Sequence, residues 1–287
     1  MILSANVSNI SALTQKLSEL FSYDFVRNAL ILTVLISISA AILGTMLVLK
    51  RYSLLGDGLS HVAFGAATIA ATLGILDLEI VTLPITVIAA ILILRSPNKK
   101  IMGDAAIALL SAGALAIGYT VMSVGGGETN LGGDVCTALF GSSAILSSSY
   151  ADITLAAVIA VILAALTYIF RHRLFSVTFD EKFARATGIK ADIYDLFFAI
   201  ITAIVIVIGM KLAGALLISS LIIFPAMSAM RICKSFKFSL LLSPMIAAIG
   251  AAVGVVLSIL ISTPVGATVA GVDIIVFAIV SLIKKRS

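Results

Sequence analysis

The feature of this sequence that most restricts its fold is a set of long stretches without a charged side chain. Asp, Glu, Lys and Arg are absent from residues 29–49, 58–76, 105–127, 153–170, 212–230 and 238–272. A helix needs about 20 consecutive apolar residues to cross the hydrocarbon core of a bilayer. Only 11% of the 287 residues are charged, against about 25% in an average soluble domain. The chain is therefore expected to be a polytopic membrane protein.

These stretches are expected to be helices. Only helices and closed barrels satisfy every backbone polar group inside lipid, and the stretches lack the two-residue alternation of barrel strands. The predicted fold class is all-α, a transmembrane bundle of eight to nine spanning helices. The range arises from two segments, either of which can be broken or span only partly. Segment 79–95 is short, and segment 212–230 contains Gly214, Ser219 and Pro225. The predicted segments are 26–49, 54–76, 79–95, 103–123, 152–170, 192–210, 212–230, 239–260 and 265–283.

The basic residues predict an orientation. Cytoplasmic loops of membrane proteins carry an excess of Lys and Arg, and five basic groups fall on one side when the N-terminus is placed outside. Because the net charge of +5 comes from these groups rather than from a basic stripe, no nucleic-acid partner is expected. The prediction is a single transmembrane domain over 1–287, with an external or interfacial segment at 1–24 and a cytoplasmic C-terminus. The groups are Lys50/Arg51, Arg95/Lys99/Lys100, Arg171/Arg173/Lys182/Arg185, Arg231/Lys234/Lys237 and Lys284/Lys285/Arg286.

Two connecting segments are long enough to contact other proteins. Residues 124–151 are polar and glycine-rich and are expected to form an external loop with a short interfacial helix near 135–146. Residues 171–191 form the largest cytoplasmic element and are amphipathic at helical spacing, with Phe179 and Phe183 on the apolar side. The chain has no G-x-x-x-x-G-K-[ST] phosphate loop, so any nucleotide hydrolysis is expected to come from a partner.

The sharpest candidate site is the pair Asp57 and His61, which starts the second apolar segment. Residues four apart share one face of a helix. A carboxylate and an imidazole in that arrangement suit zinc, manganese or ferrous iron better than magnesium or calcium. Two ligands are too few for a tight site, but a twofold dimer would supply four. Ionisable residues within a membrane are costly and usually functional.

An alternative interpretation assigns the pair no ion. Asp57 would then cap the N-terminus of its helix, and His61 would be an interfacial polar residue. Three further ionisable residues, Asp104, Lys211 and Asp273, lie close to the spans. Asp104 is expected at a helix start, while Lys211 and Asp273 are expected near outer ends, where they reach water.

Three stretches resemble the permeases of ATP-binding-cassette importers for zinc, manganese and iron. They are RYSLLGDGLSHVAFGAATIA (51–70), VTFDEKFARATGI (177–189) and GALLISSLIIFPAMSA (214–229). The first matches the family's basic residue followed by G-D-x-x-S-H and a small-residue helix. The second is similar to its cytoplasmic S-F-D-x-x-x-A-x-x-x-G-I segment, and the third to its G-x-L-L-x-x-x-L-L-I-x-P-A-x-x-A helix. The resemblance covers essentially the whole chain.

The resemblance implies a type II importer permease in a prokaryotic plasma membrane, working as a homodimer with a central pathway. The implied partners are cytoplasmic ATPase subunits and an extracytoplasmic metal-binding protein, in addition to membrane lipid. The chain itself would be no enzyme and would hold no permanent cofactor, the metal being its cargo. Asp57 and His61 are implied metal ligands. The implied residues of the ATPase-coupling helix are Phe179, Asp180, Glu181, Phe183, Ala184 and Gly188.

Two other functions fit a chain of this kind. A permease for haem, siderophore or cobalamin would need a wider pathway without a paired Asp and His. A carrier driven by an ion gradient would need no ATPase contact and hence no element such as 177–189. Both alternatives fit the residues less well than the import of a divalent ion by alternating access.

Overall fold

The computed structural model describes residues 21–75, 77–95, 103–124 and 148–285, and its elements are all α-helices. Each of the nine expected segments corresponds to one helix, which confirms the predicted all-α bundle. The helices are α2 (Asp24–Leu49), α3 (Leu55–Thr72), α4 (Leu78–Arg95), α5 (Gly103–Val124), α8 (Tyr150–Phe179), α9 (Glu181–Ala186), α10 (Ala191–Ala213), α11 (Ala215–Ile232), α12 (Phe236–Ile261) and α13 (Val265–Lys285).

The number of helices able to span a bilayer is slightly lower than expected. Within the described ranges, seven helices are long and apolar enough to cross a membrane. The two that fall short are α3 and α4. Glycines, Asp57 and His61 lower the hydropathy of α3, and the apolar part of α4, Leu78–Leu94, is short. Two of the residues that lower the hydropathy of α3 are thus the candidate site residues.

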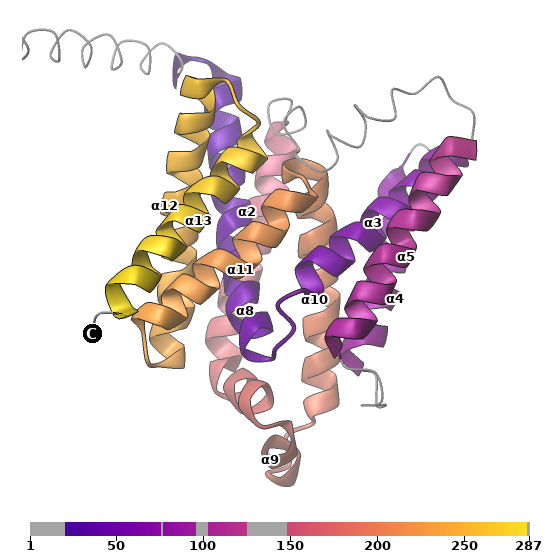
Figure 1. The fold of residues 1–287 in the computed structure, drawn as a ribbon. Coiled ribbons are helices and arrows are strands. Elements are labelled where there is room, and N and C mark those ends of the chain that lie inside the picture. Colours follow the sequence, from indigo (N-terminus) through magenta and orange to yellow (C-terminus); the bar gives the residue numbers. More distant parts are fainter. Residues whose placement is uncertain (1–20, 76, 96–102, 125–147, 286–287) are drawn as a thin grey trace, which may run out of the picture.

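The bundle is built around α2 and α11, which cross closely near its middle (Figure 1). A Cβ atom added to Gly44 of α2 would lie 1.9 Å from the carbonyl oxygen of Ile222 on α11. Only glycine permits so close an approach of two helix backbones. Helices α12 and α13 pack on one side of this centre, and α3, α4 and α5 form a group on the other. The first turns of α3 therefore lie beside α11, near the centre of the bundle.

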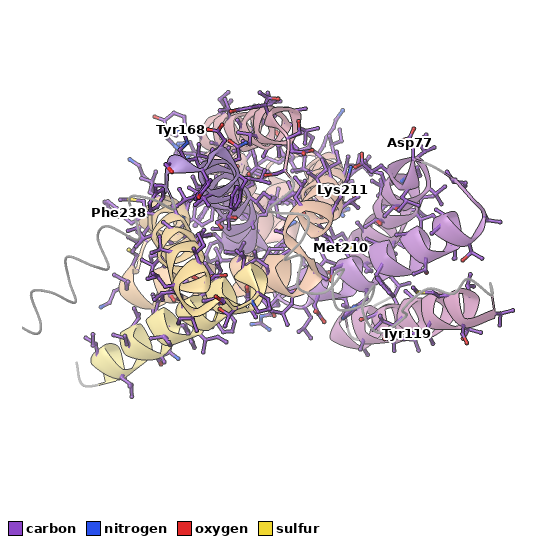
Figure 2. The ribbon with its side chains drawn as sticks, turned by 90° about the horizontal axis from the view of Figure 1, so that it is seen from above. Asp77, Tyr119, Tyr168, Met210, Lys211 and Phe238 are labelled. Carbon is purple, nitrogen blue, oxygen red and sulfur yellow. The ribbon has the colours of Figure 1, made fainter. Side chains whose placement is uncertain are left out.

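Peripheral helices expose apolar surface, as expected for contact with lipid or partner subunits. In the most apolar window of α2, 72% of the residues are buried, against 11% in that of α5. Figure 2 shows Tyr119 of α5 and Phe238 of α12 at opposite edges of the bundle. The side chains of both residues are exposed. The burial of these helices places α2 in the core of the bundle and α5 and α12 at the margins of the bundle.

The expected cytoplasmic element 171–191 is not one continuous segment. Helix α8 continues to Phe179, the chain bends at Asp180, and the six-residue helix α9 follows. In Figure 1, α9 projects from one end of the bundle, which we call the α9 end. Most of the predicted terminal segment 1–24 and the interfacial helix near 135–146 lie outside the described residues.

Candidate functional site

Asp57 and His61 face each other on the first turns of α3. Asp57 Oδ2 lies 3.5 Å from His61 Nε2. Two ligand atoms that each lie about 2.1 Å from one zinc ion at a tetrahedral angle are about 3.4 Å apart. The Asp57 side chain is 48% exposed and that of His61 is 18% exposed. The pair thus combines nearly the spacing for shared ligation with a carboxylate that an ion can reach.

The structure does not support the interpretation of Asp57 as a helix cap. The N-cap residue of α3 is Leu54, and no side chain caps this helix. Asp57 lies in the first helical turn, where a carboxylate interacts favourably with the positive end of the helix dipole. Its side chain contacts His61 and a residue of α11 instead.

The residue from α11 is Ser219, which the sequence identifies only as a polar residue of the segment 212–230. Its hydroxyl lies 3.3 Å from Asp57 Oδ1, to which it can donate, and 3.0 Å from the carbonyl oxygen of Ala215. Since one hydroxyl has one proton, the two acceptors share it. The Ser219 hydroxyl therefore adds a polar contact from a second helix to the Asp57 carboxylate.

Glycines fix the position of α3 between its neighbours. Cβ atoms on Gly56 and Gly58 would come within 2.8 Å of Ile222 on α11 and 2.5 Å of Ile107 on α5, respectively. Further along α3, a Cβ on Gly65 would lie 2.6 Å from the carbonyl oxygen of Ala114. Close contacts on both sides hold the helix that carries Asp57 and His61. The small residues of this motif thus have a packing role.

One copy of the chain offers only two candidate metal ligands at this place. No cluster of three or more His, Cys, Asp or Glu side chains occurs within the described ranges. His61 Nδ1 is buried and has no hydrogen-bond partner in the part of the chain that the structure covers. Metal-binding histidines usually donate their second ring N–H to a carboxylate or carbonyl, which strengthens the site. The arrangement suits an ion that is held briefly and released.

The other ionisable residues near the spans lie apart from this pair. Lys211, labelled in Figure 2, forms an exposed ion pair with Glu79, which joins the end of α10 to the start of α4. Asp273 was expected to reach water, and this was wrong. Its side chain packs against Gly250 of α12, and the residue is 2% exposed. The side chain of Asp104 lies outside the described residues.

The residues expected to contact an ATPase lie at the α9 end. Asp180 caps α9, its carboxylate accepting a hydrogen bond of 3.0 Å from the backbone N–H of Phe183. The Phe183 side chain is 61% exposed, and that of Phe179 is exposed to a similar degree, whereas Ala184 is fully buried. Gly188 has a φ of +85°, which favours glycine. Glu181 begins α9. Phe179, at the end of α8, and Phe183, on α9, are thus exposed at this end of the bundle, whereas Ala184 packs α9 against α8 and α10.

Comparisons with known proteins agree with this description. Residues 22–284 match the ABC 3 transport family. The manganese import system permease protein ScaB of Streptococcus gordonii is 30% identical over 78% of each chain. A probable iron transport system membrane protein of Haemophilus influenzae is 29% identical over 77% of this chain and 79% of its own. The solved structure of PsaBC from Streptococcus pneumoniae in complex with Fab matches with a TM-score of 0.78 and 27% identity, over 94% of this chain and 95% of that one.

Proposed function

The chain belongs to the ABC 3 transport family, and on that premise we propose that it is the membrane-spanning subunit of an ATP-driven importer of zinc, manganese or iron. Membership of this family confirms a multi-pass transport subunit rather than an enzyme, with ATP hydrolysis carried out by a separate partner. The observation that carries the proposed cargo is the pairing of Asp57 with His61 at 3.5 Å on α3.

In the proposed site, Asp57 and His61 bind the ion directly. The Ser219 hydroxyl orients the Asp57 carboxylate from α11. Since one chain supplies two ligands, a homodimer would complete the site with the same pair from the second copy. Oxygen and nitrogen donors of this kind accept zinc, manganese and iron, and relatives are named for manganese and for iron. The metal is cargo and not a resident cofactor.

The proposed energy source is a pair of ATPase subunits that bind at the α9 end. Phe179 and Phe183 supply apolar surface for that contact. Both side chains are exposed, and exposed apolar patches commonly mark sites of protein–protein contact. This assignment places the α9 end and the C-terminus in the cytoplasm and the N-terminus outside. An extracytoplasmic binding protein would deliver the ion to the opposite face. Closure of the ATPase dimer would then drive alternating access of the site.

The test is metal-dependent growth and uptake in cells that lack their own importers, scored separately for zinc, manganese and iron. Asp57→Ala and His61→Ala, expressed and assembled normally, are expected to lower uptake by at least roughly 10- to 100-fold, the loss already typical when a group that supports a metal ligand is removed. His172→Ala is the matched control, since His172 is exposed on α8 and apart from the pair. Uptake at the wild-type rate in both ligand variants would contradict the proposed site. Import of a chelate but not of the free ion would favour the chelate permease.

A further inference from the structure

The first turns of α10 hold contacts to three other elements. Asp192 accepts a hydrogen bond of 2.8 Å from Arg185 of α9. Tyr194 accepts one of 2.8 Å from Arg173 of α8. Asp195 forms an ion pair with Lys50, the C-cap residue of α2. Three neighbouring side chains of α10 thus join α9, α8 and α2 at one end of the bundle.

The contact with α2 differs from the other polar contacts in its burial. The side chains of Lys50 and Asp195 are 13% and 14% exposed, whereas those of Arg185 and Asp192 are both about half exposed. The Lys50 ammonium also lies 5.7 Å from the centre of the Phe198 ring, a cation–π distance. An exposed pair contributes little to stability, but removal of one member of a desolvated pair leaves an unpaired charge. The geometry of the Lys50–Asp195 pair is therefore strongly specified.

Lys50 begins a tight corner that leads directly to the candidate metal site. Arg51 has a φ of +63°, a left-handed conformation that is uncommon for a side-chain-bearing residue. The Tyr52 backbone N–H donates to the carbonyl oxygen of Leu47, and Leu55 donates to Tyr52. Asp57 follows Lys50 by seven residues. Backbone hydrogen bonds thus close the corner between Lys50 and the first turn of α3.

The start of α10, which carries Asp195, also packs against α9. Ala184 of α9 packs with Val177 of α8 and Ala191 of α10, and all three side chains are buried. This buried cluster holds α9 against the start of α10. A cavity of about 340 Å³ adjoins the pair and is lined by both the corner at Lys50–Tyr52 and the end of α8 at Thr178–Phe179. The corner is therefore separated from the end of α8 by open space, while the ion pair connects it to α10.

We propose that Lys50 and Asp195 are positioning residues that transmit the movement of α9 to Asp57 through the corner of residues 50–54. The inference rests on the proposed function, because it takes α9 as the ATPase contact and Asp57 as a metal ligand. The pair acts through the position of α3 and does not touch the ion. Without the Lys50–Asp195 ion pair, ATP hydrolysis continues but no longer drives metal transport, and the metal still binds.

The test uses the permease assembled with its ATPase subunits in proteoliposomes, and measures metal uptake and ATP hydrolysis on the same sample. Lys50→Glu or Asp195→Lys alone is expected to lower uptake per ATP hydrolysed by about 5- to 150-fold, the usual range of coupling between sites. The double variant, which restores opposite charges, is expected to recover uptake to within roughly threefold of wild type, since double-mutant cycles isolate the pairwise interaction. Asp24→Asn is the matched control, because Asp24 pairs with Arg27 at the exposed opposite end of α2.

Equilibrium binding of Mn²⁺ and Zn²⁺ to the same variants distinguishes this inference from the proposed site. Unchanged binding together with the uptake defect supports the connection. Wild-type coupling in both single variants would overturn it, and so would a double variant no better than either single one. Failure of the single and double variants to assemble would also overturn it, because the pair would then be needed for folding only. If Asp57→Ala leaves metal binding unchanged, the proposed metal site fails separately.

Discussion

Two helices of this protein each carry a carboxylate within the apolar bundle, and their surroundings differ sharply. Asp57 on α3 is about half exposed and contacts His61 and Ser219. Asp273 on α13 is 2% exposed, and its oxygens have no hydrogen-bond partner among the described residues. A buried charge without a partner is expensive. Accessibility and neighbouring donors, rather than position in a span, therefore distinguish a candidate ion site from a buried polar residue.

Glycines allow both helices to pack closely against their neighbours. A Cβ on Gly65 of α3 would press against a backbone carbonyl oxygen of α5. Next to Asp273, a Cβ on Gly250 would meet the carboxylate itself, with Oδ1 at 2.4 Å. A Cβ on Gly254 of α12 would also lie 2.6 Å from the Cα atom of Val269 on α13, so backbone contacts confine both helices, and the carboxylate limits only the space around Asp273.

The largest effect in this comparison is expected from Gly65→Ala. The added methyl group would force α3 and α5 apart and destabilise the protein by roughly 1–3 kcal/mol, as overpacking does. Gly113→Ala on α5 is the matched control, because its Cβ would meet no atom within 4 Å. Its effect should stay within about 1 kcal/mol, the size of the helix-propensity difference. Thermal unfolding of the two purified variants measures both changes in stability. Equal unfolding midpoints of Gly65→Ala and Gly113→Ala would show that the α3–α5 contact does not confine α3.

A smaller effect is expected from Ser219→Ala. Loss of the hydroxyl removes one donor to the Asp57 carboxylate, which should weaken metal binding by about 0.5–1.5 kcal/mol, or roughly two- to tenfold. Ser219→Thr keeps the hydroxyl and should bind nearly as well as wild type. Equilibrium dialysis with Mn²⁺ and Zn²⁺ measures the change. An alanine variant with unaltered affinity would remove Ser219 from the proposed site.

The smallest effect on transport is expected from Asp273→Asn. The amide has nearly the same shape as the carboxyl group and carries no charge, so uptake should remain within about twofold of wild type and stability should not fall. Metal uptake and thermal unfolding are the measurements. A loss of uptake comparable with that of Asp57→Ala would erase the distinction between the two carboxylates and would include α13 in the pathway.

The helices themselves could largely be predicted from the sequence, because uncharged stretches mark them directly. The end of α8 was harder. Arg171, His172 and Arg173 mark the end of an apolar stretch, yet they do not interrupt a helix, so α8 continues to Phe179. The pairing of Asp57 with His61 was predictable because it depends only on local spacing. Ser219 and Asp195 were not, since they lie 162 and 145 residues from their partners, Asp57 and Lys50.

The burial of Asp273 also escaped prediction. Hydropathy places a residue along a span but does not tell which side of the helix faces protein. Gly250 provides the space for the carboxylate from a different helix. Packing between segments distant in sequence therefore accounts for most of what the sequence could not predict.

The most direct measurement of the central claim is equilibrium binding of the transported metal to purified protein. Wild type is titrated with Mn²⁺, Zn²⁺ and Fe²⁺ in turn, and the tightest-binding ion is then titrated into Asp57→Asn and Asp273→Asn. We expect Asp57→Asn to lose affinity by at least about tenfold, as loss of a metal ligand or its direct support does, and Asp273→Asn to bind as wild type does. Equal affinity of wild type and Asp57→Asn would contradict the assignment of Asp57 as a ligand of the transported ion.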